Sequence, residues 1–394
     1  MTHDSPDSAA AEHLLIENFD RVVGLLGGAA RVTALARATK AFVRARGIRS
    51  AVDLLRLVLA YCLSDKGLRA TMAQAAAAGL PDVSNVALFY RLQKSGDWLE
   101  ALIGHVLAER ASATVEHLPS ATPGAIGGRL IRLVDGTTVP KAGKAGKRGK
   151  GEANGLWRIH AAYDLPSERF GAFELTEETG GEQLDRIAVV PGEIRIADRA
   201  FLQADRMAAV VAAGGDLIVR AGWKGARWLT SEGARFDLVA ALKAAEAEGT
   251  LEMPVWLGRN QGAPLGARLV AIAKPPEAAA EARDKARREA QRGGHVLSAG
   301  TLVAAGWVIL VTTLDAEAVP AHGVLALYRL RWRIELAFKR LKSQIGLAAP
   351  PGSDPGTAKA WLLAHLLVAL LLEPLTGGFE VSPRRPPAAL LRAA

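Results

Sequence analysis

A single acidic residue stands in one of the most basic stretches of the sequence. The stretch from Tyr328 to Lys342, YRLRWRIELAFKRLK, contains six lysines and arginines but only one carboxylate, Glu335. It lacks glycine and proline and is rich in good helix formers, so we expect a helix. Helical periodicity places four side chains on one narrow face, between an apolar stripe and a basic edge: Tyr328, Arg331, Glu335 and Lys342. On such a face the carboxylate could bind a metal ion while the cations bind phosphate groups.

The same pattern is compatible with an ordinary amphipathic helix on the surface. In that case Glu335 would form an i,i+4 pair with Arg331 or Lys339 and would have no chemical role. Other parts of the sequence must distinguish these two interpretations.

Two aspartates elsewhere follow short apolar runs that resemble strands. Asp135 lies in LVDGT and Asp198 in RIADRAF, and each is expected to end its strand, where α/β folds place functional residues. The predicted order is three strands, a helix, a strand, a helix, a strand and a helix, which is typical of a ribonuclease-H-like core. If the first and fourth strands are neighbours, Asp135, Asp198 and Glu335 converge. Either aspartate could instead be a turn or helix-capping residue.

Three converging carboxylates repel one another unless cations neutralise them. Carboxylate oxygens are good ligands for hard divalent ions such as Mg²⁺, for which Mn²⁺ can substitute. Two such ions about 3.5–4 Å apart activate an attacking oxygen and stabilise a leaving oxygen in phosphodiester chemistry. The three acids therefore predict metal-dependent chemistry on a phosphodiester.

The composition favours an acidic partner. The chain has 394 residues, of which half are hydrophobic, and a net charge of +9. We therefore expect a globular protein that binds nucleic acid rather than a membrane. The single cysteine, Cys62, excludes a disulfide framework and a cysteine-based zinc site and suits the cytoplasm. The apolar run 361–372 is too short for a membrane span, which predicts a buried helix.

Changes in composition divide the chain into five expected parts. A Gly/Pro-containing linker at 120–128 separates a helical region from strand-like runs. A β-rich insertion with a charged helical arm at 277–294 looks separate from the rest. The parts are a helical N-terminal domain (1–120), the first part of the α/β core (129–222), the insertion (223–320), the second part of the core with the Glu335 helix and a C-terminal helix (321–376), and a flexible tail (377–394).

Local patterns predict the elements inside these parts. A basic loop at 141–150 has five lysines and arginines among glycines and would help to bind phosphates. Helices are expected at 182–190 and 203–213. Strands are expected at 130–139, 156–165, 169–178, 193–201 and 216–222 in the core, and at 252–258, 266–273 and 306–312 in the insertion.

The segment 68–96 predicts two helices separated by a Gly-Leu-Pro break. The second helix would begin after Asp82 or Ser84. This is the outline of a helix-turn-helix with Asn85, Tyr90 and Arg91 on its second helix, although any helical hairpin has the same outline.

With these residues in place, the sequence resembles the DDE transposases of bacterial insertion sequences, in particular the IS-four family. That group carries the pattern Tyr-x2-Arg-x3-Glu-x6-Lys around its third acid. The pattern is complete here as Tyr328, Arg331, Glu335 and Lys342. The DGT at Asp135, the ADRAF at Asp198 and the long gap before Glu335 are also similar to the family, over roughly residues 50–350.

The resemblance implies a fold and a set of functional residues. The fold would be an α/β, ribonuclease-H-like catalytic core interrupted by a β-rich insertion, with an all-helical N-terminal DNA-binding domain. Asp135, Asp198 and Glu335 would be the catalytic triad that binds two Mg²⁺ ions. Phosphates near the cleaved end would be held by Tyr328, Arg331 and Lys342. Further DNA contacts would come from Arg333 and, by stacking on a flipped base, from Trp307 and Trp332.

The resemblance also implies an activity. The protein would bind the inverted-repeat ends of its own element, cleave the DNA by water attack and join the freed 3′-OH to target DNA, with hairpin ends as the family's route. It would act as a homodimer on double-stranded DNA at the bacterial nucleoid in the cytoplasm, without a membrane. Two other functions stay open: a non-catalytic DNA-binding regulator derived from a transposase, and a nuclease of the same fold that lacks strand transfer.

Overall fold

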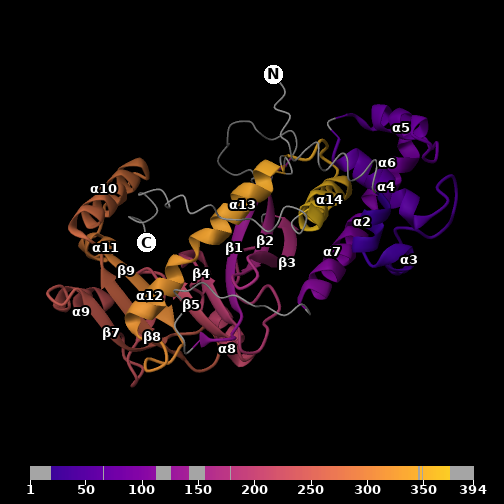
Figure 1. Cartoon of the computed structure of the whole chain (residues 1–394). Coiled ribbons are helices and arrows are strands. Elements are labelled where there is room, and N and C mark those ends of the chain that lie inside the picture. The colour runs from indigo at the N-terminus through magenta and orange to yellow at the C-terminus, as the bar shows by residue number, and fades with distance from the viewer. Residues whose placement is uncertain are drawn as a thin grey trace.

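The computed structural model describes residues 19–64, 66–111, 126–141, 156–177, 179–344, 347 and 349–372. The expected tail at 377–394, most of the expected linker, and all of the basic loop except Lys141 lie outside these residues. The described part of the chain is built around one mixed sheet with helices on both faces (Figure 1).

The sheet has nine strands among the described residues, in the order β3-β2-β1-β4-β5-β9-β8-β7-β6. β1, β2 and β3 are antiparallel neighbours, and β4 and β5 run parallel to β1. The strand runs predicted from the sequence are present, but the run predicted at 193–201 is a strand only over residues 194–197 and continues as a 3₁₀ helix over 199–201. Their bounds are Ile131–Pro140 (β1), Leu156–Asp164 (β2), Arg169–Glu177 (β3), Ile194–Ala197 (β4), Asp216–Arg220 (β5), Trp228–Leu229 (β6), Thr250–Leu257 (β7), Leu265–Ala273 (β8) and Trp307–Thr312 (β9).

The insertion continues the core sheet, whereas the sequence suggested a separate unit. Its last strand, β9, pairs antiparallel with β5, and β8, β7 and β6 follow outwards from β9. All six residues of β9 are buried. A buried strand needs hydrogen-bond partners on both of its edges, and the place between β5 and β8 provides them.

Asp135 lies in the middle of β1, not at its end as predicted. β1 pairs with β4 only over residues 131–133, but with β2 over residues 132–140. The parallel ladder with β4 therefore stops just before Asp135, while β1 itself continues beside β2. Asp135 thus follows the part of β1 that pairs with β4, but it does not end β1 itself.

The two faces of the sheet are covered by different helices. One face packs against α12, α13 and α14, and the other against α8 and α9. Because side chains alternate along a strand, Asp135 shares the first face with Leu133, and Asp198 shares it with Ile196. The bounds of these helices are Ala204–Ala212 (α8), Leu238–Ala244 (α9), Ala321–Arg329 (α12), Trp332–Gln344 (α13) and Pro355–Leu372 (α14).

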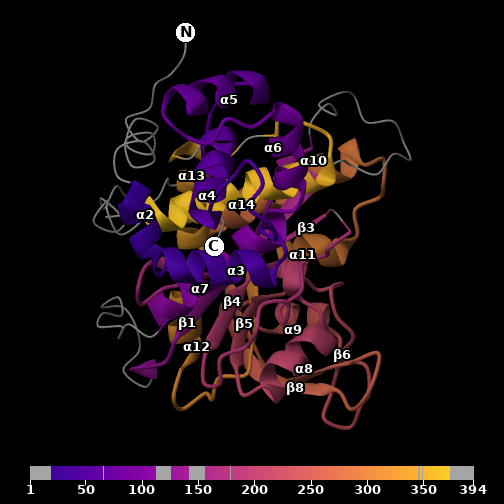
Figure 2. The ribbon, with the colours of Figure 1, turned by 90° about the vertical axis from the view of Figure 1, so that its right-hand side faces the viewer.

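The N-terminal helices and α14 pack into one bundle, which Figure 2 shows from its own side. α14 contacts α7, α6 and α4, and it also touches β3 and α13. Its length and composition would allow it to span a membrane, but 67% of it is buried inside the fold. It is a core helix, as predicted, and it connects the bundle to the sheet. The other helices of the bundle are Phe19–Leu25 (α2), Gly28–Ala38 (α3), Ala51–Cys62 (α4), Leu68–Ala77 (α5), Asn85–Gln93 (α6) and Gly96–Ala111 (α7).

The two helices predicted in segment 68–96 are present as α5 and α6. Ser84 caps α6, because its hydroxyl accepts a hydrogen bond from the Ala87 N–H at 3.2 Å. Residues 78–84 connect the two helices. This connection is longer than the turn of about three to four residues in a helix-turn-helix.

The α6 residues that were predicted to face DNA have different environments. Tyr90 is 60% exposed. Arg91 donates hydrogen bonds to the carbonyl oxygens of Ala41 and Arg44, at 3.5 and 3.3 Å. Arg91 therefore supports the loop before α4, and Tyr90 is available to a partner.

No helix forms over residues 182–190, so that prediction is wrong. Arg195 of β4 is fully buried, and its guanidinium donates hydrogen bonds to the carbonyl oxygens of Leu184 and Ala188. A helix would use such carbonyl oxygens for its own i to i+4 hydrogen bonds. The contact with Arg195 holds the segment as a series of turns.

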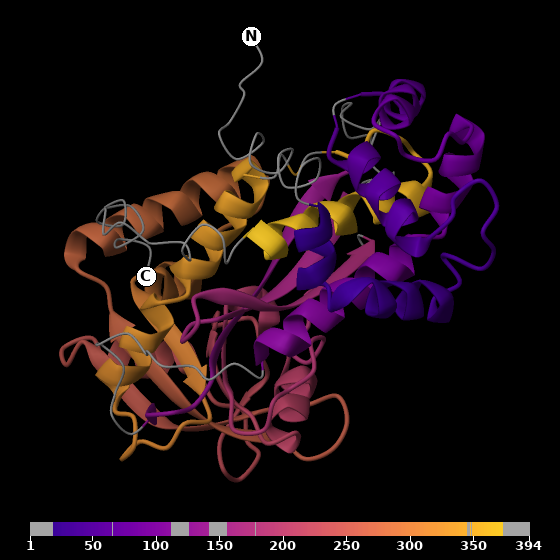
Figure 3. The ribbon, with the colours of Figure 1, turned by 45° about the vertical axis from the view of Figure 1, so that its right-hand side comes forward.

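The charged arm predicted at 277–294 is α10 (Pro276–Arg292), which is followed by α11 (Ala299–Ala305). α10 begins with a proline in its first turn, a position that favours helix initiation. Figure 3 shows α10 on one side of α13 and the N-terminal bundle on the other.

The single helix predicted over 328–342 is two helices. α12 ends at Arg329, α13 begins at Trp332, and residues 330 and 331 form a turn between them. The N–H groups of Leu330 and Arg331 bond to carbonyl oxygens three residues back, which is the tighter 3₁₀ spacing. One continuous helical wheel therefore does not describe the positions of Tyr328 and Glu335.

Candidate active site

Asp135 is a largely buried acid on the α12–α13 face of the sheet. Its side chain is 18% exposed and accepts a hydrogen bond from the Gly136 N–H at 2.8 Å. A Cβ atom at position 136 would lie 3.1 Å from Oε1 of Glu182. The glycine thus allows a second carboxylate to approach the strand beside Asp135.

Asp198 follows β4 directly, as predicted. It caps the short 3₁₀ helix η2 (Arg199–Phe201), and its Oδ1 accepts a hydrogen bond from the Ala200 N–H at 2.7 Å. β1 and β4 are parallel neighbours, so Asp135 and Asp198 lie close together at the end of their shared ladder. The capping hydrogen bond uses only one carboxylate oxygen of Asp198, so the capping role does not exclude a functional one.

Arg331 joins two of the predicted acids across the molecule. Its Nη1 lies 3.4 Å from Oδ2 of Asp135, and its Nη2 binds Oε1 of Glu335. The side chain of Arg331 is 19% exposed and that of Glu335 is 40% exposed. These contacts hold the first turn of α13 over β1, so the predicted first and third acids share one site.

The carboxylates at this site influence one another. Burial raises the pKa of Asp135 from 3.8 to about 6; the charges of Asp198 and Glu182 also raise it, and Arg331 opposes them. Burial likewise raises the pKa of Glu182, with a further contribution from Asp198. Partly buried clusters of like charge are typical of functional sites.

Glu182 is absent from the acids predicted above. It lies in the irregular segment between β3 and β4 and forms a salt bridge with Arg158 of β2 at 3.3 Å. The sequence analysis expected a helix over 182–190, and nothing in that pattern marked Glu182 as a functional acid. The glycine at position 136 was the available signal, since a glycine within a strand often indicates the close approach of another group.

Known proteins resemble this chain over most of its length. A family model described as "Transposase DDE domain" matches residues 126–371, which include Asp135, Asp198 and Glu335. The chain belongs to the DDE transposase family. The putative transposase InsL for insertion sequence element IS186A of Escherichia coli K12 is 40% identical over 362 residues, which cover 91% of this chain and 93% of that protein. The transposase for insertion sequence element IS421 of Escherichia coli is 40% identical over 363 residues, with the same coverage.

The predicted resemblance to transposases of insertion sequences is therefore confirmed. The donor chemistry of the transposase site suits a divalent ion, because its acids offer only carboxylate oxygens. Within the residues that the structure describes, no three His, Cys, Asp or Glu side chains are arranged to hold a metal ion. In this arrangement Glu335 is engaged by Arg331 instead.

Tyr328 and Lys342 of the transposase pattern reach the site from different elements. Tyr328, on α12, is 3% exposed; burial raises the pKa of its phenol, on which the charges of Arg331, Arg220 and Asp198 also act. The phenol therefore lies near Asp198. Lys342, on α13, donates a hydrogen bond from Nζ to the carbonyl oxygen of Thr138 on β1, at 3.1 Å.

Arg333 and Trp332 lie beside this site but have different partners. The guanidinium of Arg333 binds the carboxylate of Glu168 in the β2–β3 turn, so it ties α13 to that turn. Trp332 is partly exposed at the start of α13, next to Arg331.

The predicted DNA contact Trp307 lies away from the candidate acids. It begins β9 and is 6% exposed, and it packs in the core cluster of the α8–α9 face with Ile309 and Val311. This is the face opposite α13. In this arrangement Trp307 is a core residue of the strand and is not accessible to a DNA base.

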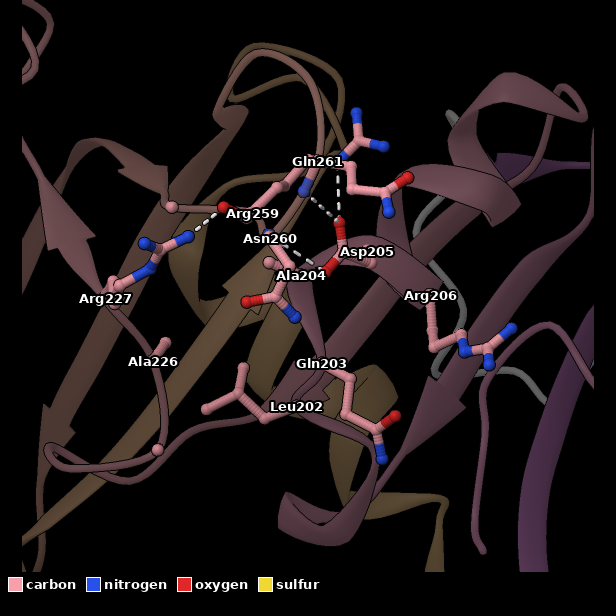
Figure 4. A pocket seen from close by; sticks show the side chains of 12 residues that line it. Leu202, Gln203, Ala204, Asp205, Arg206, Ala226, Arg227, Arg259, Asn260 and Gln261 are labelled. Carbon is pink, nitrogen blue, oxygen red and sulfur yellow. Dashed lines mark hydrogen bonds and ion pairs between the residues drawn. The ribbon is translucent and has the colours of Figure 1, made fainter.

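A cavity of about 720 Å³ lies beside the segment that follows Asp198 (Figure 4). It is bounded by the start of α8, the loop after β5 and the β7–β8 turn. Asp205 of α8 accepts hydrogen bonds from the backbone N–H groups of Asn260 and Gln261 and pairs with Arg259 at 3.3 Å. These contacts fasten the β7–β8 turn of the insertion to the start of α8.

The raised pKa of Asp135 makes a prediction about stability. The pKa of the Asp135 carboxyl rises from about 4 in the unfolded protein to about 6 in the folded protein. The free energy of unfolding therefore falls as the pH rises from about 4 to about 6, because the unfolded protein releases this proton more readily. Asp135→Asn removes this penalty. At pH 7 the variant should be more stable than the wild type by roughly 2–3 kcal/mol.

The measurement is urea unfolding of both proteins in the presence of a chelator, at pH 7 and pH 4. The two proteins should differ at pH 7 and nearly coincide at pH 4. An equal difference at both pH values would mean that the substitution acts through packing and not through the carboxylate charge.

Proposed function

We propose that this protein excises and inserts its own insertion sequence by metal-dependent cleavage and strand transfer at the inverted-repeat ends. The observation that carries the proposal is the bridge that Arg331 makes between Asp135 and Glu335, beside Asp198. The bridge joins an acid of β1 to an acid of α13, and the pairing of β1 with β4 supports a position for Asp198 beside them. Relatives that are named as transposases of insertion sequences support the same substrate.

The strand order supports a ribonuclease-H-like core for this enzyme. An antiparallel β3-β2-β1 unit is followed on the other side of β1 by β4 and β5, both parallel to it. α8 makes the crossover between β4 and β5. In this interpretation the helical bundle is the DNA-reading part, and the exposed Tyr90 on α6 is one of its contacts.

Domains of this family use divalent metal ions, and we infer Mg²⁺, with Mn²⁺ as a substitute. Asp135, Asp198 and Glu335 would hold the ions. When bound, the ions supply activation of the attacking oxygen and stabilisation of the leaving oxygen. Arg331 would exchange its carboxylate partners for a DNA phosphate, which frees Asp135 and Glu335 as ligands.

The remaining residues of the pattern would position the DNA. Lys342 lies beside β1 as a point charge for a phosphate. The phenol of Tyr328 is buried near Asp198 and would contact the scissile phosphate once Arg331 has moved to the DNA. Trp332 would stack on a flipped base during a hairpin step. Because transposition joins two ends, we propose a homodimer that forms on DNA.

The experiment uses a labelled duplex that carries the inverted repeat from the flank of the protein's own gene. Wild type and Glu335→Ala are incubated with Mg²⁺, with Mn²⁺ or with a chelator, and the products are separated on denaturing and native gels. Wild type should give nicked and then hairpin or joined products with either ion and none with the chelator. The Glu335→Ala variant should bind the duplex without cutting it.

The products also test the two other functions. Cleavage without any joined or hairpin product would favour a nuclease of the same fold. If the wild type forms protein–DNA complexes on the native gel but cleaves the duplex under none of the ionic conditions, the result would favour a DNA-binding regulator and contradict the proposal.

A further inference from the structure

The sheet edge that carries Asp198 continues into β5. Ala197, the last residue of β4, pairs with Val219, so the next residues, Asp198 just after β4 and Arg220 at the end of β5, stand at the same end of neighbouring parallel strands. Arg220 is also two residues after Ile218, which packs on the α12–α13 face. Alternation therefore places Arg220 on the same face of the sheet as Asp198.

The same edge extends through the insertion to Lys274. β9 runs antiparallel to β5, and its first residue, Trp307, pairs with Ala273 at the end of β8. The N–H of Lys274 then donates to the carbonyl oxygen of Gly306 at 2.8 Å, which continues the ladder by one residue. Lys274 is two residues after Ile272, which packs against the cluster of the α12–α13 face. Lys274 is thus on the same face and at the same edge.

The charge environment of Lys274 is unfavourable for the fold. Burial lowers the pKa of its ammonium to about 8, and the charges of Arg220 and Lys285 lower it as well. Among the described residues, no carboxylate contributes to this shift. Lys285 is exposed on α10, which stands on the insertion side of α13 (Figure 1). A partly buried cation beside two other cations is typical of a site for an anion.

We propose that Arg220, Lys274 and Lys285 form a phosphate-binding track that carries the DNA backbone from the acids across the insertion. The proposal rests on the transposase function proposed above. Lys342 lies beside β1, on the opposite side of β4 from Arg220. The DNA backbone would then be held by cations on both sides of the scissile phosphodiester. Contacts of this kind act on phosphates and are independent of base sequence.

The test compares Lys274→Met with a matched variant, Arg287→Met. Both remove one positive charge from the insertion, but Arg287 is 57% exposed and pairs with Asp284 on its own helix at 2.7 Å. The probe is a fluorescent inverted-repeat duplex, titrated by anisotropy with wild type and variants at several salt concentrations. A second duplex of random sequence and a third that ends at the inverted repeat, without flanking DNA, are measured in the same way.

Lys274→Met should weaken binding of both the repeat and the random duplex by about threefold to tenfold and reduce the slope of log K against log salt by about 1. Addition of Lys285→Met should reduce the slope again by about the same amount. If Lys274→Met also loses affinity for the duplex that ends at the inverted repeat, the track lies on the transposon side of the cut. If affinity is lost only for the duplex with flanking DNA, the track lies on the flanking side. Arg287→Met should leave affinity and slope unchanged.

Thermal unfolding provides a readout that a purely structural role would not give. Because Lys274 is an unfavourable cation in the fold, Lys274→Met should keep or raise the melting temperature while it weakens DNA binding. Lys274→Arg should restore the affinity. If the wild type binds and cleaves the duplex but Lys274→Met behaves like Arg287→Met, the track is refuted and the proposed function stands. If the wild type neither binds nor cleaves, both proposals fail.

Discussion

Replacement of Asp198 with alanine should abolish cleavage of the inverted-repeat duplex while the variant keeps its fold and its DNA affinity. We expect a loss of at least about a thousandfold in rate, equivalent to roughly 4 kcal/mol of transition-state stabilisation. Asp198 stands at the end of the β1–β4 ladder and its charge acts on both Asp135 and Glu182.

The measurement is single-turnover cleavage with Mg²⁺, alongside anisotropy titration of the same duplex. Asp198→Asn is a useful second variant, because its amide oxygen can still accept the capping hydrogen bond from Ala200. If Asp198→Asn and Asp198→Ala are equally inactive, cleavage requires the negative charge of Asp198, and the capping hydrogen bond alone does not restore it. An exposed acid, Glu248, replaced by alanine serves as the control. Residual activity of Asp198→Asn within tenfold of wild type would contradict a role as a metal ligand.

Glu193→Ala should produce the largest loss of stability among the substitutions considered. Glu193 is fully buried and contacts two arginines on adjacent strands: Arg195, and Arg132 at 3.1 Å. Arg132 and Arg195 face each other in the β1–β4 register. Arg132 would keep Asp164 at 2.7 Å, but the fully buried Arg195 would lose its carboxylate partner beside a second cation, which costs about 3–5 kcal/mol.

Chemical denaturation of wild type and variant at pH 7 measures this loss. Asp284→Ala is the matched control, since it removes the acid from a surface pair in which both side chains are more than half exposed; it should change stability by less than about 1 kcal/mol. A similarly small effect of Glu193→Ala would show that water reaches the two arginines. Such a result would contradict the full burial of Glu193 and Arg195 at the start of β4.

The buried charges also support the active site. Arg195 binds the carbonyl oxygens of Leu184 and Ala188, in the segment that brings Glu182 to the acids. The stability of the β1–β4 ladder and the position of that carboxylate are therefore coupled. We expect a partial loss of activity in Glu193→Ala below its unfolding temperature, in contrast to the complete loss in Asp198→Ala.

Much of the fold could be predicted from local pattern. The strands of the core and insertion, the charged arm and the buried C-terminal helix follow from alternation, length and hydrophobicity, which are properties of short segments. The helix over 182–190 was wrongly predicted because the guanidinium of Arg195, on β4, binds carbonyl oxygens of that segment. The break between α12 and α13 was also missed, since residues 330 and 331 are ordinary helix formers and carry no turn signal.

Residue types at fixed spacing were enough to predict the family, the acids Asp135 and Asp198 near the β1–β4 ladder, and the helical pattern around Glu335. Their surroundings were set by the tertiary structure. It joined the insertion to the core sheet through β9, turned Trp307 away from α13, and brought Glu182 and Lys274 to the edge of the sheet. Those outcomes depend on pairing between strands far apart in the chain, and each strand alone is equally compatible with other neighbours.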